Sequence, residues 1–379
     1  MKKVKLGEVC EIRIGKTPNR SQTLYWGGDY PWLSISDMKG KILCTTKEKI
    51  TQEAVQKEKM QIVSKGTVVM SFKLSIGKVG ILAENMYTNE AIANFVVKNN
   101  KMLFNEYLYY ALQGINFDSL TDRAVMGKTL NKAKLNNLSI VYNEPFMQQQ
   151  IVLRLDGVNK LIESRKQQLS ELSKLVKSRF NEMFGDPVLN EMGWDKHALK
   201  EFGIWKSGGT PKRNEEEFFR GNIPWITSGE LEHKYIEDSF EKISEKAIEC
   251  SSAKIIEKGS LLLGMYDTAG LKSSINTKVM SCNQAIAFAK LDDKITNTIY
   301  VYYVIQNLRS MLLNQQRGVR QKNFNLSMIR NISIPLPPLS LQNEFADFVA
   351  QVDKSQLAIQ KSLEELETLK KSLMQEYFG

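Results

Sequence analysis

Hydrophobic residues recur every seven positions through residues 145–185, and this pattern predicts one long amphipathic helix. A strict seven-residue apolar repeat keeps one seam on the same side of a helix, as in a coiled-coil contact. Pro145 near the start, and Gly185 followed by Pro187, favour these ends. At 1.5 Å of rise per residue the helix is about 60 Å long. The positions of the seam are Leu155, Val158, Ile162, Leu169, Leu172, Val176 and Met183.

A second helix of the same kind is predicted over residues 339–379, and its last seventeen residues align with 169–185. The net charge is +3 over 145–185 and −3 over 339–379. Opposite charge favours pairing of the two helices with each other over self-association. The alternative is that each apolar row faces an ordinary globular core. The seam of the second helix contains Phe345, Val352, Ile359, Leu366 and Leu373.

The segments that precede the two helices are also copies of one another. Residues 6–20 match residues 199–213, and both contain a Gly-x-Thr-Pro motif. At the same offset a Pro-Trp pair, a Lys-Gly pair and a set of tyrosines recur, at positions 31–32 and 224–225, 65–66 and 258–259, and 107–110 and 300–303. After a one-residue insertion, Arg123 and Lys128 align with Arg317 and Lys322. The chain is therefore predicted to be a globular unit plus a long helix, written twice.

Within each unit the short-range pattern is mixed. In the first copy, residues 67–72, 79–82, 91–98 and 140–142 are predicted strands, and 106–112 is a predicted helix. The proline-rich segment 334–338 takes the place of the last strand in the second copy, which fits an edge or terminal strand. The predicted fold class is α+β, with two similar mixed α/β domains (1–144 and 186–338) separated by two long helices (145–185 and 339–379) in a pseudo-two-fold repeat.

Composition narrows the class of protein. The chain has 379 residues, of which 42% are hydrophobic and 25% charged, so it is globular. It contains no run of eighteen apolar residues, and its start lacks an apolar segment, so we expect no membrane span and a cytoplasmic location. The four cysteines have no C-x-x-C spacing and only two histidines exist, which argues against disulfides and against a metal site.

The charge balance points to a polyanionic partner. The chain carries a net charge of +10 at pH 7, with +8 in residues 1–144 and +2 in residues 186–338. Double-stranded DNA is the simplest partner for such a surface, although the charge alone does not identify it.

Taken together, the motifs resemble one family. Gly-x-Thr-Pro, then Pro-Trp about fourteen residues later, a Lys-Gly-apolar strand, and Pro-Leu-Pro-Pro leading into a long helix occur in this order. The chain resembles the DNA-specificity subunit of type I restriction–modification systems, over essentially its whole length. The first copy departs from the pattern only at 141–145, where the proline run is degraded.

This resemblance implies that each globular domain is a target recognition domain reading one half of a split, asymmetric DNA sequence. It implies that the two helices pack antiparallel, act as a spacer and dock two modification (methyltransferase) subunits, with restriction subunits joining through that core. S-adenosylmethionine, ATP and Mg²⁺ are then expected only in the partner subunits, with no cofactor in this chain.

Candidate DNA contacts are basic and polar residues near glycine turns, where the backbone can approach a ligand closely. The alternative is a solvated, lysine-rich surface. A residue shared by both copies more plausibly holds phosphate or structure, because sequence-reading residues should differ between the copies. The candidates are Lys16, Thr17, Arg20, Lys73, Lys78, Arg123 and Lys128 in the first copy, and Lys206, Thr210, Lys212, Arg213, Tyr266, Lys272, Arg317, Arg320, Gln321 and Lys322 in the second.

No catalytic pattern is evident in the sequence. The chain lacks the Asn/Asp-Pro-Pro-aromatic strip of adenine methyltransferases and a phosphate-binding loop. Asp37-x-Lys39 and Glu232-x-Lys234 only faintly resemble nuclease carboxylate–lysine pairs. We therefore expect a non-catalytic recognition and assembly subunit; the alternatives are an enzyme with atypical motifs and a repeat scaffold that ignores DNA. The repeated tryptophans and tyrosines are expected to be structural.

Overall fold

The computed structural model describes the backbone of residues 2–117, 122–124, 127–266, 271–317 and 323–379, and their side chains except at 122–124, 127–129 and 315–317. These residues form two compact units. Unit 1 consists of Met1–Gln167 together with Gln360–Gly379, and unit 2 consists of Gln168–Ile359. Each unit is described by itself.

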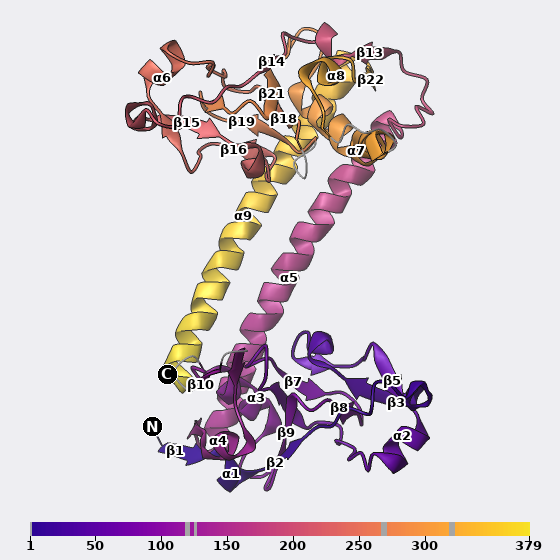
Figure 1. Ribbon diagram of the computed structural model, residues 1–379, viewed down its shortest axis with the longest axis vertical. Coiled ribbons are helices and arrows are strands. Elements are labelled where there is room, and N and C mark those ends of the chain that lie inside the picture. Colours follow the sequence, from indigo (N-terminus) through magenta and orange to yellow (C-terminus); the bar gives the residue numbers. More distant parts are fainter. Residues whose placement is uncertain (1, 118–121, 125–126, 267–270, 318–322) are drawn as a thin grey trace. The chain divides into compact units, whose positions relative to one another are not determined.

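Unit 1 contains short strands and helices, followed by the first part of a long helix and the last part of another (Figure 1). Its elements are β1 (Lys2–Lys5), α1 (Leu6–Val9), β2 (Cys10–Ile14), η1 (Thr23–Tyr25), β3 (Trp26–Leu33), η2 (Ile35–Asp37), β4 (Ile42–Leu43), β5 (Glu48–Ile50), α2 (Gln52–Lys57), β6 (Val68–Ser71), β7 (Val79–Leu82), β8 (Tyr87–Thr88), β9 (Ile92–Val97), α3 (Asn105–Gln113), β10 (Asp122–Ala124), β11 (Gly127–Thr129), α4 (Lys132–Asn137), β12 (Ser139–Tyr142) and the long helix α5 (Pro145–Phe184).

Unit 2 repeats this series and shares both long helices. Its elements are β13 (Lys196–Ala198), η3 (Leu199–Glu201), β14 (Lys206–Ser207), η4 (Glu216–Phe219), β15 (Ile223–Ile226), η5 (Ser228–Glu230), β16 (Tyr235–Ile236), β17 (Lys242–Ile243), α6 (Glu245–Glu249), β18 (Leu261–Gly264), β19 (Ser273–Asn276), β20 (Ser281–Cys282), β21 (Ile286–Ala289), α7 (Thr298–Arg317), α8 (Leu326–Arg330), β22 (Ser333–Pro335) and the long helix α9 (Leu339–Phe378).

The two units have the same sheet topology. The five-stranded sheet has the order β2-β9-β6-β7-β4 in unit 1 and β14-β21-β18-β19-β16 in unit 2. The three-stranded sheets, β5-β3-β8 and β17-β15-β20, also correspond, as do the pairs β1-β12 and β13-β22. In the central hairpins Val68 lies opposite Ile81, and Leu261 lies opposite Ile275. The predicted duplication and the predicted α+β fold class are thereby confirmed.

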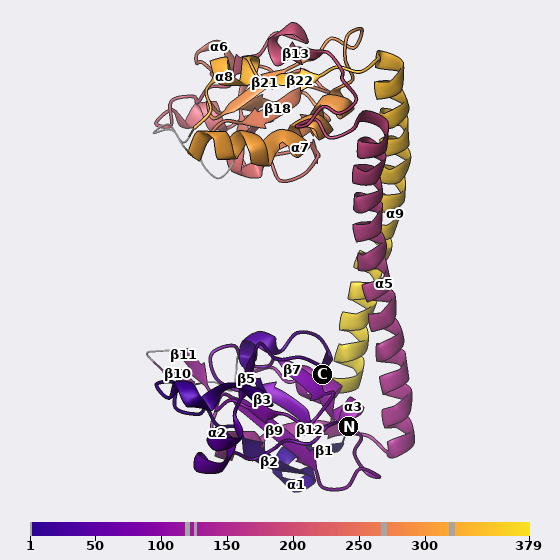
Figure 2. The same cartoon turned by 90° about the vertical axis from the view of Figure 1, so that its right-hand side faces the viewer.

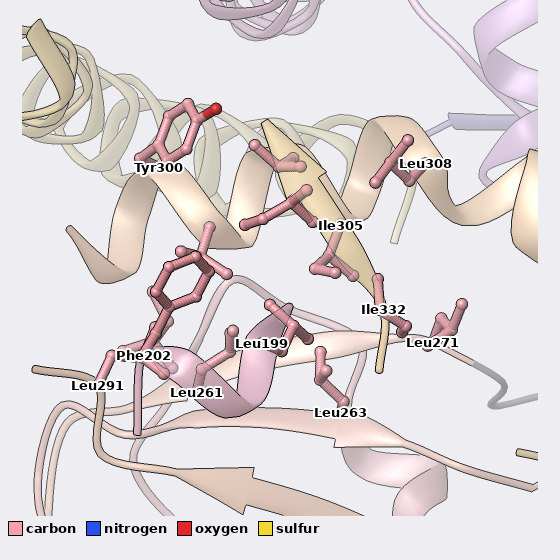
Figure 3. Close-up of a cluster of buried hydrophobic side chains, with 14 of the residues drawn as sticks. Leu199, Phe202, Leu261, Leu263, Leu271, Leu291, Tyr300, Ile305, Leu308 and Ile332 are labelled. Carbon is pink, nitrogen blue, oxygen red and sulfur yellow. The ribbon is translucent and has the colours of Figure 1, made fainter. Parts of the chain in front are cut away.

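The central strands are apolar because both faces of each five-stranded sheet are covered. All residues of β6 and of β18 are buried. In unit 2, α7 packs on the sheet next to β19, and Figure 2 shows it running along the strands. Figure 3 shows side chains of the hydrophobic cluster that lies between α7 and this sheet. Tyr107 and Tyr300 are buried in the two cores, and their hydroxyls donate to Val141 O (2.9 Å) and Pro335 O (2.8 Å), so these two tyrosines are structural.

Within each unit a part of α5 pairs with a part of α9 in antiparallel fashion. In unit 1, Arg154 Nη1 donates to the Tyr377 hydroxyl (3.0 Å), whereas Lys166, later in α5, lies 3.9 Å from Glu367, earlier in α9. Unit 2 shows the same opposed order. There Gln356 Nε2 donates to Ser173 Oγ (3.2 Å), and Arg179 pairs with Glu344 (2.9 Å).

The ends of each seam also belong to the globular cores. Leu155 packs in the same cluster as Tyr107 and Phe378, and Val176 packs with Phe345 and the core of unit 2. The middle positions Leu169, Leu172, Ile359 and Leu366 are half-buried. Both interpretations of the apolar row therefore apply: the row faces a globular core at the helix ends and forms a helix-pairing seam between them. Leu363, which the predicted row omitted, is buried as well.

Among the described residues, no helix combines the length and the apolar character that a membrane span requires. The four cysteines are free thiols, and Cys10 and Cys282 are buried. Burial raises the pKa of the Cys10 thiol to about 12. No group of three potential metal ligands gathers within the part of the chain that is described.

Candidate nucleic-acid interface

The Gly-x-Thr-Pro motif forms a turn that lies directly on the segment joining β8 to β9 in unit 1, or β20 to β21 in unit 2. The backbone N–H of Gly15 donates to Ile92 O (3.0 Å), and that of Gly208 donates to Ile286 O (3.1 Å). A Cβ at Gly15 would lie 2.2 Å from Asn89 O, and one at Gly208 would lie 2.3 Å from the corresponding carbonyl. Glycine is required here because the two backbones touch.

The tryptophan of each Pro-Trp pair holds this turn in place through a hydrogen bond to its backbone. Trp32 and Trp225 are 1% exposed, and their indole N–H groups donate to Lys16 O and Gly209 O, each at 3.0 Å. A buried indole whose N–H is satisfied by the backbone has no face left for a base. The structural interpretation of these tryptophans is confirmed.

The arginine that ends each motif is engaged in two ways. Arg20 donates to both carboxylate oxygens of Glu48, at 2.5 and 3.0 Å, and its guanidinium lies 3.8 Å from the Trp26 ring centroid. Arg213 repeats the arrangement with Glu241, at 2.5 and 2.9 Å. These hydrogen bonds lower the pKa of both glutamates. The arginines thus brace the turn, and a DNA contact by either one stays a prediction.

Three segments that are distant in sequence meet beside this turn in unit 1. The Thr17 hydroxyl donates to Glu90. Next to Glu90, the carbonyl of Ala91 accepts from Phe72 N–H (3.0 Å), and Phe72 O accepts from Leu130 N–H (3.1 Å). The motif turn, the β8–β9 turn, the β6–β7 turn and the end of the β10–β11 hairpin are therefore joined by consecutive hydrogen bonds.

Unit 2 contains the same series. The Thr210 hydroxyl donates to Gln284 Oε1, Met265 N–H donates to Ala285 O (2.8 Å), and Phe324 N–H donates to Met265 O (2.7 Å). We call this feature the loop edge. It comprises residues 15–20, 72–78, 88–91 and 130 in unit 1, and residues 208–213, 265–266, 271–272, 282–285 and 324 in unit 2.

Most predicted DNA contacts that the structure describes lie on the loop edge. Lys16 and Lys78 are exposed, Lys73 is half-buried, and the Lys16 ammonium lies 2.7 Å from Glu58, which lowers the pKa of that carboxyl. In unit 2, Lys212 and Tyr266 are exposed and Lys272 is half-buried. Lys206 lies just outside the loop edge, in β14, and is exposed.

The remaining predicted contacts lie at or beyond the limit of the described residues. Arg123 and Lys128 are opposite each other in the β10–β11 hairpin, but their side chains are not described. Arg317 is the last residue of α7, and its side chain is likewise outside the described set. Three further candidates also lie outside it, namely Arg320, Gln321 and Lys322.

The family model for the type I restriction modification DNA specificity domain matches residues 1–174 and 191–369. The chain belongs to this family. The specificity subunit of type I restriction enzyme MjaIX from Methanocaldococcus jannaschii is 25% identical over 98% of this chain and 90% of that protein. The EcoR124I/EcoR124II specificity subunit of Escherichia coli is 26% identical over 43% of this chain and 41% of its own length.

Solved structures show the same fold. The S subunit of a type I restriction–modification system from M. genitalium has a TM-score of 0.65 at 14% identity, and the alignment covers 100% of this chain and 96% of that one. A chain from a study of complex assembly and conformational transition of the type I system has a TM-score of 0.61 at 16% identity, covering 99% and 97%. The family resemblance expected from the motifs is confirmed: this is a DNA sequence-recognition subunit.

Sequence reasoning missed several residues of this specificity subunit. Glu90 and Gln284 were not among the candidates, and their only signal is the alignment of Asn-Glu-Ala-Ile with Asn-Gln-Ala-Ile. Lys234 is the lysine of one faint nuclease-like pair, yet it is bound to Asp353 (2.5 Å). Asp37, from the other pair, accepts the backbone N–H of Ser34 (3.0 Å) in a local turn.

Proposed function

We propose that this specificity subunit reads an asymmetric, interrupted DNA target, with the loop edge of each unit meeting one half-site. One observation carries the proposal: the same loop edge is built twice, on the same hydrogen bonds, with different exposed side chains. Lys16 of unit 1 is replaced by Gly209 in unit 2, and Glu90 is replaced by Gln284. Two similar readers with unlike surfaces suit two unlike half-sites.

The chemistry of the loop edge fits a duplex. Lysine ammonium groups neutralise phosphates and make binding salt-dependent, whereas side chains on the same surface can meet base edges in a groove. Turns whose backbones touch, as at Gly15 and Gly208, hold such side chains on a rigid base.

The long helices are proposed to act as the spacer between the readers and to dock two modification (methyltransferase) subunits, through which restriction subunits join. Exposed apolar side chains on the helices are available for such docking, among them Leu153 (66% exposed) and Leu161 (50%) on α5 and Leu357 (74%) on α9. S-adenosylmethionine, ATP and Mg²⁺ would then be bound by the partners, and the complex would act in the cytoplasm.

Selection of bound duplexes from a randomised DNA pool tests the proposal. The full-length chain should recover two short, different sequence blocks separated by a fixed gap. Lys78→Gln should weaken binding to all sequences and reduce the slope of log affinity against log salt by about 1, as expected for one lost phosphate contact.

Lys101→Gln is the matched control, because Lys101 is exposed beyond the end of β9 that lies away from the loop edge. Its salt slope should equal that of the wild type. Recovery of one continuous block, or of no sequence, contradicts the proposal. Methyl transfer from S-adenosylmethionine to DNA by this chain alone would instead favour an enzyme.

A further inference from the structure

The loop edge carries one chemical difference at matched positions of the two units. Glu90 and Gln284 each follow an asparagine and precede the strand that pairs with β6 or β18. The two asparagines, Asn89 and Asn283, donate their backbone N–H groups to the tryptophan-bearing strand at 3.0 and 2.9 Å. The positions therefore correspond in structure as well as in sequence.

Both side chains are exposed and are held in the same way. The Thr17 hydroxyl donates to one carboxylate oxygen of Glu90, and the Thr210 hydroxyl donates to the amide oxygen of Gln284. After this contact Glu90 retains a second oxygen, which can only accept a hydrogen bond. Gln284 retains its NH₂ group, which donates, together with the remaining lone pair of its oxygen.

A carboxylate is an unfavourable neighbour for phosphates, and neither Lys16 nor Arg20 uses it as an ion-pair partner: Lys16 is bound to Glu58, and Arg20 to Glu48. A carboxylate is favourable where a base presents an exocyclic amino group. In the major groove, Glu accepts from cytosine N4, whereas Gln pairs in bidentate fashion with adenine N6 and N7.

We propose that Glu90 and Gln284 are base-reading residues at equivalent positions, with Glu90 selecting cytosine and Gln284 selecting adenine in their respective half-sites. The inference rests on the proposed function and deepens it. The repeated threonine, tryptophan and arginine cannot distinguish the half-sites because they are the same in both units. The threonines position the two readers.

The duplication itself shows that the residues can be exchanged. Gln284 fits beside Thr210 in the same loop geometry that holds Glu90 beside Thr17. Glu90→Gln should therefore fold and keep its hydrogen bond to Thr17. A purely structural contact would leave the preferred DNA sequence unchanged after this substitution.

Selection from a randomised duplex pool, with the full-length chain, gives the test. Glu90→Gln should change the preference from cytosine to adenine at one position of one half-site, by about 5- to 150-fold, and leave the other half-site intact. Gln284→Glu should make the reverse change in the other half-site. Glu84→Gln is the matched control, since Glu84 is exposed and follows the end of β7 that lies away from the β6–β7 turn.

The outcomes separate the two proposals. If the wild type selects a bipartite target and Glu90→Gln, with an unchanged melting temperature, selects the same bases, the base-reading role is overturned and the proposed function stands. A uniform loss of binding to all sequences also overturns it, as does the same change of preference in Glu84→Gln. If the wild type selects no sequence, both proposals fail.

Discussion

Asp353→Asn should destabilise unit 2, because Asp353 joins α9 to the globular part of that unit through a poorly hydrated ion pair. Asp353 lies 2.5 Å from the Lys234 ammonium and accepts from the Tyr235 hydroxyl at 3.1 Å. The Lys234 ammonium also donates to the Tyr303 hydroxyl at 3.3 Å. Only 16% of the Lys234 side chain and 21% of the Asp353 side chain are exposed. Burial lowers the pKa of Lys234 even though Asp353 acts to raise it.

The magnitude follows from leaving a buried charge without its partner. Breaking a buried ion pair on one side costs roughly 3–5 kcal/mol. Water reaches about a fifth of both side chains, and asparagine keeps an oxygen acceptor for Lys234. We therefore expect a loss of about 2–3 kcal/mol in the free energy of unfolding. The corresponding Lys41–Asp156 pair of unit 1 has a carboxylate that is 42% exposed, so Asp156→Asn should cost only about 1 kcal/mol.

Equilibrium urea unfolding, followed by tryptophan fluorescence, measures the effect. Asp347→Asn, on the exposed face of the same helix, is the control and should stay within about 0.5 kcal/mol of the wild type. The double variant Lys234→Met/Asp353→Leu should recover most of the loss, because it removes both charges together. The reasoning is refuted if Asp353→Asn lowers the free energy of unfolding no more than Asp347→Asn does. It is also refuted if the double variant loses as much unfolding free energy as Lys234→Met and Asp353→Leu lose separately, added together.

Two further predictions concern the loop edge and the tyrosine cores. Gly208→Ala should lower the free energy of unfolding by about 1–3 kcal/mol and weaken DNA binding, because its Cβ would meet two carbonyl oxygens at 2.3 Å. Gly229→Ala is the control and should have neither effect, because a Cβ there meets nothing within 4 Å. Equal urea midpoints for the two variants would contradict this prediction. Burial raises the pKa of Tyr107 and Tyr302 from 10.0 to about 12. As the pH rises, the unfolded chain loses these phenolic protons before the folded chain does. Each tyrosine therefore contributes at most about 3 kcal/mol to the free energy of unfolding, and this contribution is complete below pH 10 and is lost as the pH rises towards 12. Urea midpoints that stay constant over this range would refute the assignment.

The architecture was predictable because its signals are repeated or periodic. The seven-residue row fixed both long helices, whose observed ends are Pro145 and Phe184, and Leu339 and Phe378. The internal alignment predicted that the units share one topology, since matched residues in a duplication take matched places. Short runs of apolar residues, such as the one in 67–72, were sufficient for the central strands, which are covered on both faces.

The contacts of the loop edge were not predictable, because they join residues far apart in sequence. Thr17 and Glu90 are separated by 73 positions, and Arg20 and Glu48 by 28. A single sequence contains no signal for such pairs. The motif glycine drew attention to a possible phosphate contact, whereas its role in the structure is to let one backbone rest on another.

Comparison of the two units distinguishes contacts that are formed by different residues from contacts that are formed by the same residues. Lys41 and Lys234 are aligned, yet their carboxylate partners are not: in the alignment of the long helices, Asp353 lies opposite Asn159, one turn beyond Asp156. The ion pair between the globular part and its helix is therefore present in both units although its acidic residue has moved. The loop edge shows the opposite: its hydrogen bonds are the same, whereas some of its exposed side chains differ, as at Glu90 and Gln284. A reader whose frame is fixed in this way can acquire a new target by substitution at the surface, without a change in the fold beneath it.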